Sequence, residues 1–277
     1  MSETSAARET AGLEGDGDIE LLNQEGAKTY FEREFPDLKH SFCRELTCVV
    51  CMDEGTAHMD IDGEGKFCMA GSGILYPAAN EEERVIKVAD IFIERGIKHL
   101  TSHDGCGAAE KAYRAANNLS KDDKVDKDVV SAYAKEWVRK VSEEMGRRGH
   151  GAEVSHIVSG QMLRPEGLHT ARVVYYDGVG GFNPNKEVGL PMGFVSERKF
   201  LSAAYIASEL NVAVEIAFSS HGLNNEFDSP EHPFIIVVFA NNAAELSSLK
   251  EEVAGVLEDN EHYKAGKVKI DGMVVER

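Results

Sequence analysis

The sequence predicts an α/β fold in which flanking helices cover a mainly parallel central sheet. Short apolar runs of strand length alternate with longer segments that repeat apolar residues at helical spacing. The first such passage has the order strand, helix, strand, which is typical of a right-handed crossover between parallel strands. Polar residues and glycines follow several predicted strands, at the carboxyl ends where α/β sheets bind ligands.

Each element has its own local signal. Asn80 and Glu83 form a predicted capping box at the start of a helix, and Gly96 ends that helix. Valine-rich runs bounded by glycine or acidic turns indicate buried strands. The first half of the chain is predicted to contain strands over 46–51, 66–75, 97–102, 154–160 and 170–178 and helices over 80–96, 105–118 and 129–146. The second half is predicted to contain helices over 196–210 and 242–258 and strands over 212–220, 233–240 and 267–276.

The predicted domain organisation has three parts. Residues 1–18 are small, polar and acidic, and they are expected to form a disordered tail. Residues 19–190 are expected to form a metal-binding α/β domain. Residues 191–277 form a C-terminal α+β extension, which either adopts a ferredoxin-like layer or continues the first sheet. No internal repeat is apparent.

Composition restricts the class of protein. The 277 residues carry a net charge of −18, which disfavours binding to nucleic acid or to anionic membranes. The sequence contains neither an apolar stretch of membrane-spanning length nor an apolar signal segment, so we expect a cytoplasmic protein. Five cysteines in such a chain indicate metal binding or simple burial rather than disulfides.

The candidate functional residues lie at strand ends. Cys51 and Asp53 are two positions apart and can share one face of a strand, whereas Cys48 and Cys51 should diverge, which disfavours a redox pair. His103 ends another strand, and Cys106 opens a helix, where the helix dipole favours a thiolate. Three ligands, Cys51, His103 and Cys106, suit zinc and leave a fourth position open. The alternative is that His103 caps a turn and both cysteines are simply buried.

These motifs resemble the β-class carbonic anhydrases. "CMDEG" and the later "SHDGCGAA" match the family's Cys-x-Asp-x-Arg and His-x-x-Cys-Gly motifs in order and context. "FCMAGSGI" and "VVYYDGVGG" lie where the family has further strands with glycine-containing turns. The likeness covers about residues 25–185.

The resemblance implies that Cys51, His103 and Cys106 bind zinc and that Asp53 is the catalytic carboxylate. It further implies a lyase that hydrates carbon dioxide to bicarbonate with zinc-bound hydroxide, or that hydrolyses a related small molecule such as carbonyl sulfide or carbon disulfide. Because the family's site lies against a partner subunit, we expect a homodimer or a larger homo-oligomer. The aromatic stretch that contains Tyr30, Phe31, Phe35 and Phe42 suits exchange between the two subunits.

One position departs from the family pattern. The arginine that pairs with the catalytic aspartate is replaced by Gly55. Without it, Asp53 either finds another cation, with Lys66 and Arg84 as candidates, or becomes a fourth zinc ligand. The second case predicts a catalytically silent, zinc-stabilised binding or assembly protein.

Overall fold

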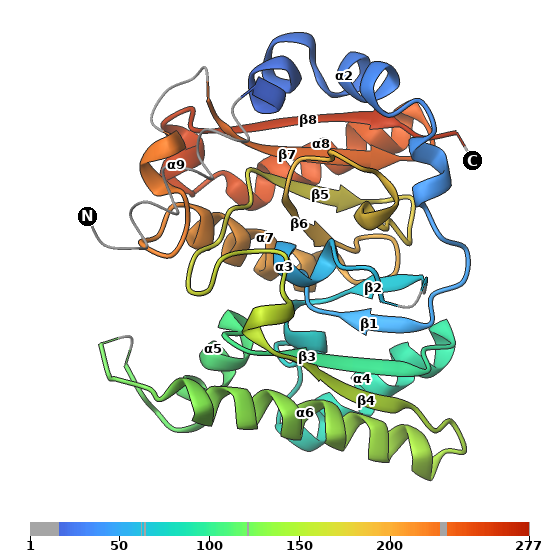
Figure 1. Ribbon diagram of the computed structural model, residues 1–277, viewed down its shortest axis with the longest axis vertical. Helices are drawn as coiled ribbons and strands as arrows, with labels where there is room; N and C mark the ends of the chain where they lie inside the picture. The colour runs from blue at the N-terminus through green and yellow to red at the C-terminus, as the bar shows by residue number, and fades with distance from the viewer. Residues whose placement is uncertain (1–16, 62, 64, 121, 228–231, 277) are drawn as a thin grey trace. The chain divides into compact units, whose positions relative to one another are not determined.

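The protein folds into two compact units. The structure is a computed structural model that describes residues 17–61, 63, 65–120, 122–227 and 232–276. Residues 44–162 form one unit, here called the central unit after its place in the sequence, and the segments before and after it form the terminal unit. Each unit contains a four-stranded parallel sheet with helices beside it (Figure 1). The predicted α/β class with parallel sheets is therefore confirmed.

The central unit has the strand order β2-β1-β3-β4. β1 pairs with β2 and β3, and β3 pairs with β4, all in parallel. The carboxyl ends of β1 and β3 therefore lie next to each other. The elements of this unit are β1 (Cys48–Val50), α3 (Glu54–Ala57), β2 (Lys66–Cys68), the 3-10 helix η2 (Ala70–Gly73), α4 (Glu81–Arg95), β3 (His99–His103), α5 (Gly107–Ala116), α6 (Lys127–Arg147), β4 (Glu153–Ile157) and the 3-10 helix η3 (Ser159–Gln161).

Helix α4 shows how local sequence sets these elements. The Asn80 side chain accepts a hydrogen bond from the Glu83 N–H at 2.9 Å, and the Glu83 carboxylate accepts one from the Ala79 N–H at 2.7 Å. Gly96 ends the helix with φ of 75°, in the left-handed region that favours glycine. The Asn80 cap and the Gly96 terminus are therefore confirmed. The capping box is only half formed, because the Glu83 carboxylate binds the N–H of Ala79 and not that of the N-cap residue Asn80. Helix α4 packs along α6.

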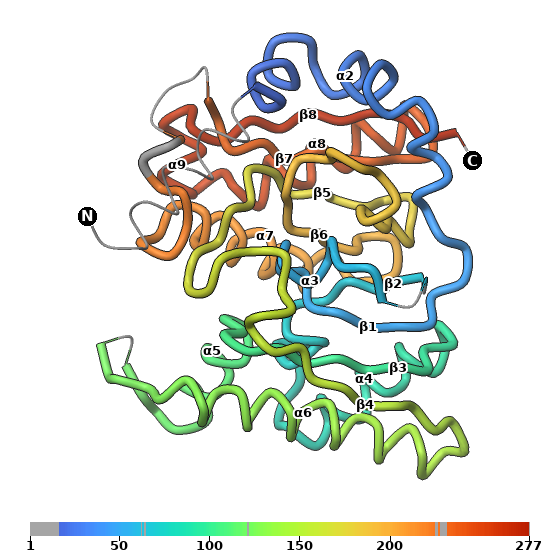
Figure 2. Tube along the Cα trace, in the orientation of Figure 1, coloured from blue at the N-terminus to red at the C-terminus, as the bar shows by residue number. Residues whose placement is uncertain are grey.

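The terminal unit has the strand order β6-β5-β7-β8, again all parallel. Residues 17–25 are helical. The further elements are α2 (Ala27–Glu34), the 3-10 helix η1 (Leu38–Ser41), β5 (Val173–Asp177), η4 (Pro184–Lys186), β6 (Gly193–Ser196), α7 (Ala203–Ala217), η5 (Asn224–Phe227), β7 (Phe234–Ala240), α8 (Ala243–Leu257), α9 (Glu261–Lys264) and β8 (Val268–Val274). Figure 2 shows α2, from the start of the chain, beside β8 at its end, and the Ala27 N–H donates to the Asp271 carboxylate at 2.9 Å.

Several sequence predictions for this unit differ from the structure. The ferredoxin-like layer requires antiparallel strands, but β5 to β8 are parallel. The expected boundary at residue 190 would separate β5 from β6, which pair in one sheet. The strand predicted over 212–220 belongs largely to α7, whose residues are buried on several sides, so the helix lacks a clear polar face. Of the predicted disordered tail, Gly17 and Asp18 are helical and the rest lies outside the described residues.

The aromatic residues near the N-terminus pack within the terminal unit. Phe31 is fully buried, with ring centroids 5.7 Å from Phe239 and 6.4 Å from Tyr175. Phe42 lies 5.1 Å from Phe182. These side chains therefore pack in the core of the terminal unit, and their exchange with a partner stays a prediction.

The two sheets share one topology. In each sheet the first strand along the chain lies between the second and the third, and the fourth strand follows the third. The sequence shows no internal repeat, so this likeness is visible only in the structure. Within the described part of the chain, no helix combines the length and apolar character needed to cross a membrane.

Candidate metal centre

The structure brings together the three residues predicted to bind metal. Cys51 directly follows β1, His103 is the last residue of β3, and Cys106 is the N-cap of α5. One ligand atom from each residue lies within 4.8 Å of the other two, and the three residues are between 2 and 5% exposed. This group could hold a metal ion, and two thiols with one imidazole form a donor set that zinc prefers.

The two thiols differ in their affinity for a proton. A hydrogen bond with Cys106 and burial together raise the pKa of Cys51 well above its ordinary value. The same hydrogen bond lowers the pKa of Cys106, and the backbone N–H groups of Ala108 and Ala109 at the start of α5 lower it further. Of the two thiols, Cys106 therefore loses its proton more readily, and a metal ion bound by both would require that Cys51 also be deprotonated.

The tautomer of His103 is set by a backbone carbonyl. Its Nδ1 lies 2.8 Å from the Asp104 carbonyl oxygen. Because a carbonyl oxygen only accepts hydrogen bonds, Nδ1 must carry the proton, and Nε2 then carries the lone pair. Metal-binding histidines commonly show this arrangement, with the second ring nitrogen held by a carbonyl or carboxylate. Nε2 is therefore the nitrogen available to a metal ion.

Gly71 contributes to the site through its backbone. Its N–H donates to Cys51 Sγ at 3.2 Å, and its φ is +53°. A Cβ at this position would lie 2.7 Å from Ile74 Cγ2, 3.0 Å from Ala108 Cβ and 3.4 Å from Cys106 Sγ. The sequence predicts a glycine-containing turn after this strand, but no motif marks Gly71 as part of the site. Its role depends on a turn in η2 that no ligand motif marks.

Asp53 is the N-cap of the short helix α3. Its Oδ1 accepts a hydrogen bond from the Gly55 N–H at 2.8 Å, and the residue is 4% exposed. Asp53 does not belong to the group formed by Cys51, His103 and Cys106, although its charge acts on Cys106. At the position of the family's arginine, this chain therefore supplies a backbone N–H to the aspartate.

The two cations considered as replacements for the arginine have identified carbonyl partners. Lys66 Nζ donates to the Ala57 carbonyl and, at 2.6 Å, to the Met59 carbonyl, so it holds the end of α3. Arg84 Nε donates to the Tyr76 carbonyl at 2.8 Å.

The equivalent positions in the terminal unit carry no such donor set. Asp177 caps the turn after β5 by accepting hydrogen bonds from the N–H groups of Val179 and Gly180, as Asp53 does after β1. Tyr175 precedes Asp177 by two residues, as Cys51 precedes Asp53. Phe239 precedes the N-cap of α8 by three residues, as His103 precedes Cys106. The rings of Tyr175 and Phe239 are stacked at 5.9 Å with an interplanar angle of 5°, so aromatic packing occupies these positions.

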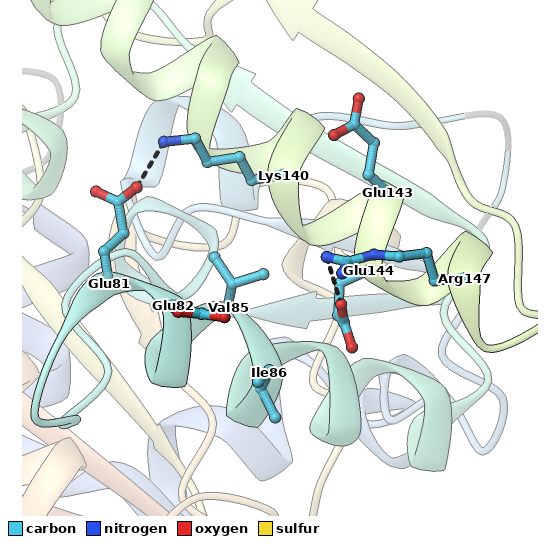
Figure 3. Close-up of a pocket in the computed structure, with 8 residues that line it drawn as sticks. All are labelled: Glu81, Glu82, Val85, Ile86, Lys140, Glu143, Glu144 and Arg147. Atoms are coloured by element: carbon cyan, nitrogen blue, oxygen red, sulfur yellow. Dashed lines mark hydrogen bonds and ion pairs between the residues drawn. The ribbon is translucent and has the colours of Figure 1, made fainter.

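A groove between α4 and α6 also carries several ionisable groups. Figure 3 shows Glu81, Lys140, Glu144 and Arg147 along its walls. It has a volume of about 270 Å³. Lys140 pairs with Glu81 at 2.5 Å, and Arg147 pairs with Glu144 at 2.6 Å. These neutralised pairs are typical of a solvated helix surface rather than of a binding site.

Comparison with known proteins does not assign the chain to a family. Protein-family models, curated proteins and solved structures gave no match to it. The functional interpretation therefore depends on the geometry of the site and on the motifs described above.

Proposed function

We propose that this protein is a zinc enzyme that hydrates carbon dioxide to bicarbonate or hydrolyses a related small molecule such as carbonyl sulfide or carbon disulfide. The proposal rests on one observation above all. Cys51, His103 and Cys106 converge at the carboxyl ends of two adjacent parallel strands, with one ligand atom of each within 4.8 Å of the others. The order and spacing of the motifs, which resemble those of β-class carbonic anhydrases, support the same reaction.

The residues of the site suit this chemistry. Bound zinc makes a water molecule acidic enough to act as a nucleophile near neutral pH. Cys51, His103 and Cys106 would supply three of four ligands and leave one position open. Two thiolates donate more charge than two imidazoles, so the chain needs a further group that favours the deprotonated nucleophile. Asp53 is our candidate, since its carboxylate is oriented by the Gly55 N–H and can accept a hydrogen bond.

A second candidate function follows from the same aspartate. In the family, an arginine holds this carboxylate away from the metal. Gly55 occupies the position of that arginine in this chain. If Asp53 moved to complete the ligand set, the site would be closed and the protein would be a catalytically silent, zinc-stabilised binding or assembly protein. Asp53 is not a member of the group of three ligand residues, and its Oδ1 is bound by the Gly55 N–H, which favours the open site and the enzyme.

Stopped-flow carbon dioxide hydration between pH 7 and 9 distinguishes the two functions. For the enzyme, the zinc-loaded wild type is active, and Asp53→Asn keeps its zinc but loses most activity because an amide is a poorer acceptor. For the closed site, the wild type is inactive near neutral pH, and Asp53→Ala gains anion binding. A zinc-loaded wild type without activity, together with an Asp53→Ala variant that binds no anion, would contradict both.

The oligomeric state is part of the proposal. We propose a homodimer or a larger homo-oligomer, as the resemblance implies. Tyr30 and Phe31 are fully buried, and exchange of this segment would replace these contacts by the same contacts with a partner. Light scattering at micromolar concentration should give at least twice the chain mass of 30.3 kDa, and a monomeric mass would overturn this part of the proposal.

A further inference from the structure

Asp104, the residue after the histidine ligand, is held by hydrogen bonds from three elements. Its N–H donates to the Ile157 carbonyl at 3.0 Å. Its Oδ1 accepts from the Ser131 hydroxyl on α6 at 2.8 Å and from His156 Nε2 on β4 at 2.8 Å. Its Oδ2 accepts from the Ser159 N–H at 3.1 Å. Four hydrogen bonds therefore fix the position of this residue.

His156 is itself held in one orientation. Ser102 and His156 are register partners on β3 and β4, and Ser102 Oγ lies 2.9 Å from His156 Nδ1. The Asp104 carboxylate only accepts, so His156 Nε2 carries the proton and Nδ1 accepts from the Ser102 hydroxyl. The two ring nitrogens of His156 therefore bind the side chains of Ser102 and Asp104, which lie at the same end of β3.

The hydrogen-bonded order Ser102, His156, Asp104 contains the residue types of a nucleophilic triad, but its setting indicates another role. Ser102 is only 6% exposed and lies within a paired strand. The Asp104 carboxylate accepts two hydrogen bonds besides that from His156, as expected of an anchor. The connection that leads toward the candidate metal centre is the Asp104 carbonyl, which accepts the Nδ1–H of His103 at 2.8 Å.

We propose that Asp104, anchored by His156 and Ser131, is a positioning residue that fixes the tautomer and ring orientation of His103 for metal binding. A carbonyl held at a defined place selects the Nδ1–H tautomer and directs the Nε2 lone pair toward the two thiols. The expected effect of Asp104 on metal affinity rests on the proposed metal site. The expected effect of Asp104 on the His103 tautomer does not require a bound metal.

Two measurements test this role. In metal-free protein, nitrogen-15 NMR of the histidine rings, with the His103 signal assigned by its loss in His103→Gln, should show the Nδ1–H tautomer in the wild type. Asp104→Ala and His156→Ala should shift His103 toward a mixture of tautomers. Chelator competition should show zinc affinity reduced about 10- to 100-fold in these variants, the range typical for outer partners of metal ligands. Ser131→Ala should act in the same direction, and Ser131→Thr should restore the wild-type values.

The chain offers matched controls. Ser142 is also on α6, and its hydroxyl donates to the Ala152 carbonyl at 2.8 Å. His99 also bonds a serine across β3 and β4, with Nε2 2.7 Å from Ser155 Oγ. Ser142→Ala and His99→Ala should therefore change neither the tautomer of His103 nor the zinc affinity.

The outcomes separate this proposal from the proposed function. An unchanged His103 tautomer in both His156→Ala and Ser131→Ala, or a wild type that already shows a mixture, would overturn the positioning role. A wild type that binds no zinc would overturn the proposed function, while the NMR measurement would still decide the role of Asp104. If Asp104→Ala does not fold, the His156→Ala and Ser131→Ala variants decide whether Asp104 positions His103.

Discussion

Replacing Gly71 by alanine should disturb the metal site through the backbone alone. Gly71 has φ of +53°, and its N–H donates to Cys51 Sγ at 3.2 Å. The added Cβ would lie 2.7 Å from Ile74 Cγ2 and 3.0 Å from Ala108 Cβ. The Ile74 side chain can rotate, but Ala108 Cβ moves only with α5, whose first residues stabilise the Cys106 thiolate.

The magnitude follows from these two effects. A left-handed backbone costs alanine roughly 1–2 kcal/mol relative to glycine, and overpacking adds about 1–3 kcal/mol. The free energy of unfolding of the central unit should therefore fall by about 2–5 kcal/mol. Since relief of the contact moves Cys51 or Cys106, zinc affinity should fall with it.

Gly96→Ala is the matched control. Gly96 also has a positive φ, 75°, and a Cβ there would have no neighbour within 4 Å. This variant should lose only the backbone contribution, roughly 1–2 kcal/mol, and should keep its zinc affinity. Urea unfolding measures the free energy of unfolding, and chelator competition measures the zinc affinity. Equal losses of stability in the two variants, with unchanged zinc affinity in both, would refute the reasoning.

Two further predictions concern the terminal unit. Phe239→Ala removes a fully buried ring that stacks on Tyr175. Urea unfolding should show that the free energy of unfolding falls by about 3–5 kcal/mol. The zinc content should not change. Arg198 donates to both carboxylate oxygens of Glu252 and holds the pKa of Glu252 below its ordinary value. The ion pair therefore stabilises the folded protein at neutral pH, and this contribution is lost as the pH falls below about 4 and Glu252 is protonated. Arg198→Met should therefore lower stability by about 2 kcal/mol at pH 7 and by progressively less on acidification; a pH-independent difference would contradict the assignment.

The ligand group could be predicted because it depends on short-range rules. Parallel order places the ends of two neighbouring strands together, so Cys51 after β1 meets His103 at the end of β3. The expected sharing of one strand face by Cys51 and Asp53 does not apply, because β1 ends at Val50 and Asp53 caps α3. His103 and Cys106 follow from one strand end and the helix start after it. The structure groups the three predicted ligand residues, whereas the metal and the reaction stay predictions.

The remaining features depend on tertiary context. β6 has four residues, Gly193–Ser196, too few for a clear alternation signal. In α7, Val212 and Val214 favour a strand locally, but burial keeps them in a helix that continues to Ala217. The anchoring of Asp104 joins residues from β3, α6 and β4 that are far apart in the sequence, and no motif connects them.

X-ray absorption spectroscopy of the zinc-loaded protein tests the central claim most directly. The account predicts one zinc per chain with two sulfur ligands at about 2.3 Å and one imidazole nitrogen at about 2.0 Å. One sulfur should be lost in Cys106→Ser, and the imidazole signal should be lost in His103→Ala. A zinc ion bound only by oxygen and nitrogen, or a sulfur count that is the same in Cys106→Ser, would contradict the assignment of Cys51, His103 and Cys106 as the metal ligands.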